Sequence, residues 1–254
     1  MSDDPGRRSV SLRRAGLADA DQVIAEEPME LRVEGRSTAI TMRTPGHDLD
    51  LALGFLLGEG VIDGADDVRA LAEVGPNVVD VRLAEGVSAA RARLADRELY
   101  ATSSCGVCGK ASLDRLPRPR QRAPGWSPSL ERVQSVAAQL SASMPLFQAT
   151  GGCHGAALFD TAGALSFVRE DVGRHNAVDK VLGAALRAEV VFSEVGLVVS
   201  SRAGFEIVQK ASAAGIPVVV CLGAATSLAV DAAEYAGIAL FGWASREPVR
   251  YGAG

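Results

Sequence analysis

This sequence is poor in several residue types on which common functions depend. Among its 254 residues there are three histidines (His47, His154 and His175), and aromatic residues make up 5%. So few histidines leave little material for a histidine-rich metal site. No uninterrupted apolar run reaches the roughly 18 residues that a membrane-spanning helix needs. The first residues also lack the apolar core of a secretory signal, so we expect a cytoplasmic protein that does not bind membranes.

The chain also lacks an excess of positive charge. Its formal net charge is −5 and its pI is about 5.3, which excludes a general nucleic-acid-binding role. Hydrophobic residues make up 48% and charged residues 22%, as in an ordinary soluble protein with a sizeable core.

Cysteine is scarce, and two of the four cysteines lie three positions apart, in Thr102-Ser103-Ser104-Cys105-Gly106-Val107-Cys108-Gly109. In the cytoplasm thiols stay reduced, so such a pair points to catalysis or metal binding before a disulfide. The Cys-x-x-Cys spacing lowers a thiol pKa when helix amides lie nearby, and the glycines leave the sulfur accessible. The pattern therefore favours thiol chemistry on an open loop.

Two other interpretations of this pair remain: half of a zinc site, or an inert structural pair. A zinc site would need two more ligands, and the adjacent residues Cys153 and His154 are poorly spaced to bind one ion. Cys221 lies in an apolar segment and is expected to be buried. The zinc deaminase signature, His-x-Glu followed by Pro-Cys-x-x-Cys, is absent, so we expect no zinc.

Three further segments could bind anions. A glycine-rich turn at residues 150–155 frees backbone amides, although a simple turn explains it equally well. Residues 169–176 place four charged side chains and a histidine before a predicted helix, which indicates either a phosphate site or an ion-pair network. Residues 200–204 could cradle a phosphate or only cap a helix, and they lack the Gly-Lys-Ser/Thr ending of a Walker loop.

The periodicity predicts an α/β protein. Strands alternate with helices in the last third, which indicates a parallel sheet covered on both faces. The first part reads as two hairpins and a helix, in which residues 78–83 pair with 89–94. The predicted helices are 48–57, 131–144, 177–186, 205–214 and 228–235, and the predicted strands outside the second hairpin are 29–34, 38–44, 155–160, 164–169, 197–201, 218–222 and 238–243.

Taken together, these segments resemble FdhD, the family of formate dehydrogenase accessory sulfurtransferases. The resemblance runs from about residue 20 to the end. Its most specific part is the run Asp171-Val172-Gly173-Arg174-His175-Asn176-Ala177-Val178-Asp179-Lys180. The other matching segments are Glu27-Pro28, Thr44-Pro45, Leu53-Gly54-Phe55-Leu56, Glu59-Gly60, Cys105 to Gly109, Thr150-Gly151-Gly152, His154, Ser200, Arg202, Gln209-Lys210-Ala211 and Thr226 to Val230.

The resemblance implies a sulfur carrier that forms a homodimer. Such a protein takes persulfide sulfur from a cysteine desulfurase and passes it to the molybdenum bis(molybdopterin guanine dinucleotide) cofactor, which formate dehydrogenase needs for activity. The family's essential cysteine matches Cys105, and its partner matches Cys108. A second interpretation keeps the cofactor binding without the sulfur transfer, as a cofactor chaperone.

The resemblance also implies an architecture and a binding site. We expect a flexible arm at 1–20, a small α+β domain at 21–100 and a cytidine-deaminase-like α/β domain at 101–254 that carries the cysteine loop. The family's cofactor-binding stretch falls on residues 241–246, and the charged segments are added to it as candidates for holding phosphates. The resulting cofactor-binding candidates are Phe241, Gly242, Trp243, Ala244, Ser245, Arg246, Arg174, His175, Lys180 and Arg202.

Overall fold

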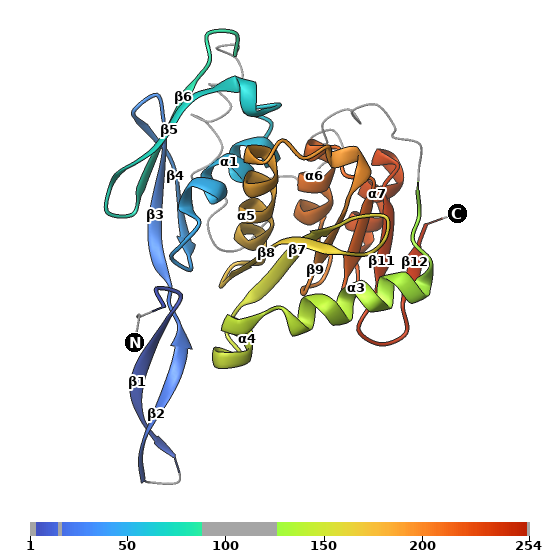
Figure 1. The fold of residues 1–254 in the computed structure, drawn as a ribbon, viewed down its shortest axis with the longest axis horizontal. Helices are drawn as coiled ribbons and strands as arrows, with labels where there is room; N and C mark the ends of the chain where they lie inside the picture. Colours follow the sequence, from blue (N-terminus) through green and yellow to red (C-terminus); the bar gives the residue numbers. More distant parts are fainter. Residues whose placement is uncertain (1–3, 15–16, 88–125, 253–254) are drawn as a thin grey trace.

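The computed structural model describes residues 4–14, 17–87 and 126–252 (Figure 1). Within these ranges the strands form three sheets of two, four and six strands, so the α/β class is confirmed. None of the helices described there is both long enough and apolar enough to cross a bilayer.

The six-stranded sheet belongs to the C-terminal part, with strand order β12-β11-β10-β9-β7-β8. Its strands are β7 (His154–Phe159), β8 (Leu165–Asp171), β9 (Gly196–Val199), β10 (Val218–Cys221), β11 (Ala239–Gly242) and β12 (Val249–Tyr251). The predicted parallel pairing is confirmed for β9, β10 and β11, which are joined through helices. β7 instead runs antiparallel to β8 and β9. The short turn after Phe159 explains the pairing with β8, because it can only fold the chain back on itself.

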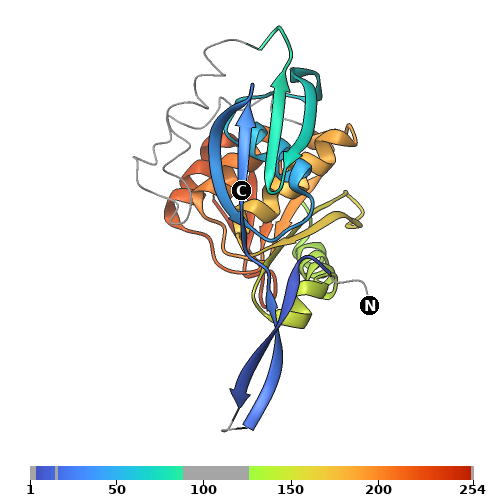
Figure 2. The ribbon, with the colours of Figure 1, turned by 90° about the vertical axis from the view of Figure 1, so that its left-hand side faces the viewer.

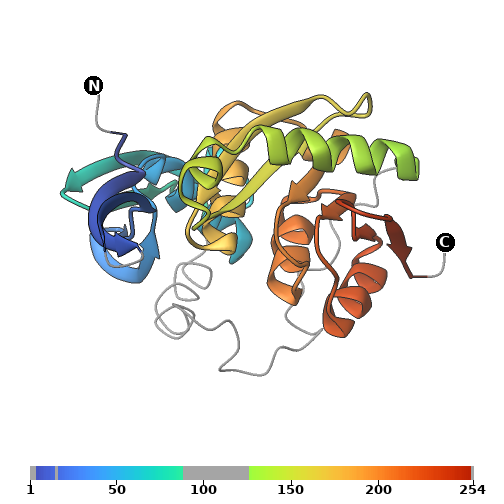
Figure 3. The same cartoon turned by 90° about the horizontal axis from the view of Figure 1, so that it is seen from below.

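Helices cover both faces of this sheet (Figure 3). Three of them pack on one face, namely α5 (Arg174–Arg187), α6 (Phe205–Ala214) and α7 (Ser227–Ala236). The opposite face is covered by α3 (Leu130–Ala142). Every residue of β10 is buried, since Val219 and Cys221 face one layer while Val218 and Val220 face the other. This two-sided burial explains the continuous apolar strands in the sequence.

The N-terminal part forms a four-stranded sheet of order β4-β3-β6-β5. Its elements are β3 (Glu27–Val33), β4 (Arg36–Arg43), α1 (Asp48–Gly58), the short helix η1 (Ala65–Asp67), β5 (Val68–Gly75) and β6 (Val78–Leu83). The hairpin of β3 and β4 is confirmed. The pairing of 78–83 with 89–94 is wrong: β6 pairs with β3 on one edge and β5 on the other, so neither edge remains free. Residues 89–94 themselves lie outside the described ranges.

The two parts share one hydrophobic core, which runs from β3 and α1 through α5 to β10. α1 crosses α5 at two glycines, which permit the close approach. A Cβ added to Gly54 would lie 1.8 Å from the Asp179 carbonyl oxygen, and one added to Gly183 would lie 1.8 Å from that of Asp50. The predicted boundary at residue 100 lies outside the described residues, and the parts on either side of it are packed against each other.

We therefore expect Gly183→Ala to destabilise the protein by about 3 kcal/mol, the upper end of the cost of an overpacked core. The added methyl group must push the backbones of α1 and α5 apart. Gly64→Ala is the matched control, because an added Cβ meets nothing within 4 Å there and the φ of −167° suits any residue. Urea unfolding monitored by circular dichroism measures both variants, and equal midpoints for them would contradict the prediction.

A two-stranded ribbon precedes this body. β1 (Arg7–Arg14) pairs antiparallel with β2 (Leu17–Ile24) and projects away from the rest of the fold (Figures 1 and 2). Its base packs near α4 (Pro145–Thr150), and a Cβ added to Gly152 just after that helix would lie 3.0 Å from Ile24 Cγ2. A regular ribbon thus occupies most of the stretch that was expected to be an arm, and the flexibility of that arm stays a prediction.

Candidate ligand-binding edge of the six-stranded sheet

Three helices begin at the same edge of the sheet. α5 follows Gly173 at the end of β8, α6 follows Gly204 beyond β9, and α7 follows Thr226 beyond β10. The first amides of a helix lack internal partners and carry partial positive charge, which attracts anions. The Thr226 hydroxyl accepts a hydrogen bond from the Ala229 amide at 3.3 Å, which covers one of these amides in α7. We call this region the carboxyl edge.

A cavity of about 390 Å³ opens at the carboxyl edge. The glycine-rich turn that leads into β7 forms part of its wall, and Met144 before α4 and Phe147 within α4 supply apolar side chains. The lining residues are Ser141, Met144, Phe147, Gly151, Gly152, Cys153, His154, Ser200 and Leu222. The Ser200 hydroxyl accepts from the Gly155 amide at 2.9 Å, which fixes the end of β9 against the start of β7. The volume is in the range of small-molecule pockets.

Two cysteines lie at this edge, and both are buried. The Cys153 thiol donates to Glu170 Oε1 at 3.4 Å, and burial together with that carboxylate raises its pKa to about 12. The Cys221 thiol donates to the carbonyl oxygens of Gly223 and Phe241, and burial raises its pKa to about 11. Both thiols therefore stay protonated at neutral pH, as expected for Cys221 from its apolar strand.

Three of the predicted phosphate-holding residues lie at this edge. Arg202 is exposed after β9, and Arg174 begins α5 beside His175. The Nε2 atom of His175 lies 3.9 Å from Glu206 Oε2 in the first turn of α6. Glu206 was not predicted, because a single glutamate in a first helical turn is explained by the helix dipole alone.

Lys180, the fourth predicted residue, has a different position. Its side chain is 1% exposed, and its ammonium group lies 2.7 Å from Asp171 Oδ2 and donates to the Thr44 carbonyl oxygen at 2.7 Å. Both partners are buried too. The structure therefore places Lys180 between the two parts of the fold, and its role in holding phosphates stays a prediction.

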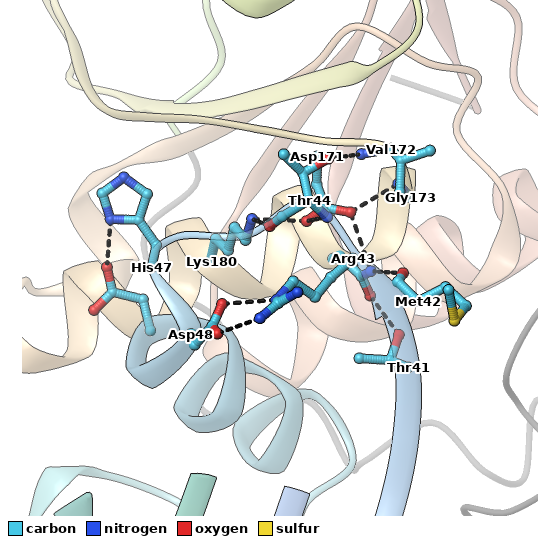
Figure 4. Close-up of polar contacts among 12 residues, drawn as sticks. Thr41, Met42, Arg43, Thr44, His47, Asp48, Asp171, Val172, Gly173 and Lys180 are labelled. Carbon is cyan, nitrogen blue, oxygen red and sulfur yellow. Dashed lines mark hydrogen bonds and ion pairs between the residues drawn. The ribbon is translucent and has the colours of Figure 1, made fainter. Parts of the chain in front are cut away.

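Figure 4 shows how the specific run 171–180 joins the end of β4 to α5. Asp171 accepts from the Thr44 amide at 3.1 Å, and the Thr44 hydroxyl accepts from the Val172 amide at 3.0 Å. Asn176 donates to the Met42 carbonyl oxygen at 2.7 Å. Of the two interpretations of the charged run, the ion-pair network therefore describes Asp171 and Lys180. We call these contacts, which join the N-terminal part of the fold to the C-terminal part, the interlobe anchor.

A second buried pair lies beside the interlobe anchor. Lys210 on α6 lies 2.7 Å from Asp179 on α5 and 3.8 Å from Glu59, which follows α1. Its ammonium also lies 5.4 Å from the centre of the Phe55 ring. The close carboxylates outweigh burial and hold the pKa of Lys210 above its usual value. Three helices thus meet at one cation, which sequence spacing does not indicate.

The predicted cofactor-binding stretch follows β11. The side chains of Phe241 and Ala244 are buried in the layer under α3, and Gly242 is buried against Tyr251. Trp243, Ser245 and Arg246 remain exposed. Trp243 has a φ of 56° and the Arg246 guanidinium carbon lies 6.0 Å from its ring centre, an arrangement that presents an aromatic face beside a cation.

Cys105 and Cys108 lie outside the described residues, so their prediction is not tested by the structure. Among the residues that it does describe, no group of three histidine, cysteine or acidic side chains is arranged to hold a metal ion. The carboxyl edge thus offers helix N-termini, the half-buried Arg174, the exposed Arg202 and a mostly apolar cavity.

The model of the FdhD/NarQ family matches residues 24–251. The chain is 45% identical over 251 residues to the sulfur carrier protein FdhD of Anaeromyxobacter dehalogenans, covering 92% of this chain and 87% of that protein. It is also 45% identical to the sulfur carrier protein FdhD of Mycobacterium tuberculosis, covering 90% of this chain and 91% of that protein.

The fold is similar to a crystal structure from Desulfotalea psychrophila, described as that of a candidate formate dehydrogenase accessory protein. The TM-score is 0.74 at 22% identity, and the match covers 97% of this chain and 96% of the other. At this identity the likeness establishes the fold.

Proposed function

Since this chain belongs to the FdhD/NarQ family, we propose that it is a sulfur carrier that supports formate dehydrogenase. In this proposal it works in the cytoplasm, takes sulfur from a cysteine desulfurase and delivers it to the molybdenum bis(molybdopterin guanine dinucleotide) cofactor. Its relatives that share 45% of their residues with it are named sulfur carrier proteins, which supports the first part.

One observation carries the assignment of the sulfur-bearing residue. A carrier needs a thiolate, and the chain has four cysteines. Cys153 and Cys221 are buried, with pKa values raised to about 12 and about 11. The acceptor role therefore falls to Cys105 and Cys108, whose Cys-x-x-Cys spacing favours a low pKa.

The transfer follows ordinary thiol exchange. The Cys105 thiolate attacks the outer sulfur of a persulfide on the desulfurase. That sulfur–sulfur bond breaks, the desulfurase cysteine leaves as a thiolate, and Cys105 carries the persulfide. The Cys108 thiolate then attacks the inner sulfur, which expels the outer sulfur as hydrosulfide toward the cofactor and leaves a Cys105–Cys108 disulfide. A small-molecule thiol reduces this disulfide and completes the cycle.

The carboxyl edge suits the cofactor as the bound substrate. Its guanine dinucleotide arms carry phosphates, which match the N-termini of α5, α6 and α7, the half-buried Arg174 and the exposed Arg202. Trp243 and Arg246 add an aromatic face and a cation in the stretch 241–246.

Mass spectrometry tests the proposal. After incubation of the full chain with a cysteine desulfurase and cysteine, we expect one added sulfur, about 32 Da, on the peptide that contains Cys105. The Cys108→Ala variant should accumulate this adduct, because release of the sulfur is blocked. A chain that binds the cofactor but never gains the adduct would instead be a cofactor chaperone, the alternative to sulfur transfer.

A further inference from the structure

His175 has an unusual position for a residue expected to hold phosphates. It lies in the first turn of α5, and its side chain is 29% exposed. Yet its Nε2 atom is buried and has no hydrogen-bond partner within the described parts of the chain. The exposure therefore comes from the rest of the side chain, while Nε2 points inward. An orphaned buried nitrogen at a ligand-binding edge requires an explanation.

Burial, helped by the cations around His175, keeps its ring neutral. Burial, followed by the cations Lys210 and Arg174 and by His154, lowers its pKa to about 3. These neighbours come from α6, from α5 itself and from β7, and the carboxylate of Glu206 on α6 lies within ion-pair distance. An imidazole that is neutral at pH 7 offers no charge to a phosphate.

Glu206 favours one position for the proton of the His175 ring. Its Oε2 atom lies 3.9 Å from Nε2, and a carboxylate favours the tautomer whose proton faces it. With the proton on Nε2, the other nitrogen, Nδ1, is left with a lone pair. Hydrogen bonds in such unliganded sites are often long and tighten when the ligand binds.

We propose that His175 is a specificity-determining residue that accepts a hydrogen bond from an uncharged N–H group of the substrate, and that Glu206 is the positioning residue that orients it. This inference rests on the proposed function, in which the substrate is a guanine dinucleotide. Its guanine and pterin rings carry amino and ring N–H donors, whereas its phosphates carry none. His175 thus recognises a guanine or pterin ring of the substrate, and Arg174 and Arg202 bind its negatively charged phosphates.

The test uses the full chain and two probes, guanosine diphosphate and pyrophosphate, by isothermal titration calorimetry at pH 8.0. We expect His175→Ala to weaken binding of guanosine diphosphate about 3- to 10-fold, the value of one neutral hydrogen bond, and to leave pyrophosphate unchanged. Arg202→Ala is the contrasting variant and should weaken both probes. His175→Gln keeps an acceptor oxygen and should recover part of the loss.

Two further measurements separate this role from a structural one. The ratio of wild-type to His175→Gln affinity for guanosine diphosphate should stay constant from pH 8.0 to pH 5.5, whereas an imidazolium contact with phosphate would make it grow as pH falls. Glu206→Gln should weaken guanosine diphosphate binding in the wild type but not in the His175→Ala background.

The inference is overturned if His175→Ala weakens pyrophosphate as much as guanosine diphosphate, or if the wild type binds neither probe. Failure of the proposed function is seen separately, because the sulfur adduct on Cys105 is measured without either probe.

Discussion

Replacing Cys105 by alanine should abolish the activation of formate dehydrogenase. The variant itself should still unfold at the wild-type temperature, so the loss is not one of stability. Without the thiolate at position 105 no persulfide forms, and the two buried thiols do not take its place because their pKa values lie near 12 and 11. The measurement is formate dehydrogenase activity in cells that lack their own copy of the carrier and express either variant.

Cys221→Ala provides the matched control, since it removes a thiol of the same size that stays protonated and does not line the cavity. It should retain nearly full activity. Wild-type activity in Cys105→Ala would refute the proposal that Cys105 carries the sulfur. Equal losses of activity in both variants would mean that the chain tolerates no cysteine replacement.

The second large effect concerns stability. Lys180→Met should cost about 3–5 kcal/mol, because it leaves the Asp171 carboxylate buried without its cation. The thioether also cannot donate to the Thr44 carbonyl oxygen, which loses its 2.7 Å hydrogen bond from Lys180. Chemical denaturation of the full chain measures this loss.

Two comparison variants define the origin of that loss. Arg32→Met breaks a partly exposed ion pair with Glu30 and should hardly change the unfolding midpoint. Lys180→Met combined with Asp171→Asn removes both charges and should recover part of the stability. If the double variant is less stable than Lys180→Met alone, burial of an unpaired charge is not the cause.

Local sequence patterns were sufficient to predict most helices and the central strands. The predicted helix 205–214 coincides with α6, because apolar spacing defines its buried face and Gly215 ends it with a φ of 83°. β10 was predicted within one residue, since a short apolar run before a glycine has few alternatives. Such signals depend only on neighbours in the chain.

Features that depend on distant segments could not be predicted. β5 was missed because most of its residues are exposed and its apolar residues do not alternate clearly. The charged run 169–176 fitted two interpretations because a sequence does not state which side chains are buried. Only the fold brings Thr44 to Asp171, 127 residues further along. The orphaned Nε2 of His175 became visible for the same reason.

The interlobe anchor sets the order in which a growing chain can fold. Thr44 and Lys180 lie 136 residues apart, so α1 leaves the ribosome long before α5 exists to cover it. At bacterial rates of synthesis this delay is on the order of 10 s, during which the apolar face of α1 is open to solvent. Nascent chains of this protein should therefore depend on chaperones until α5 emerges.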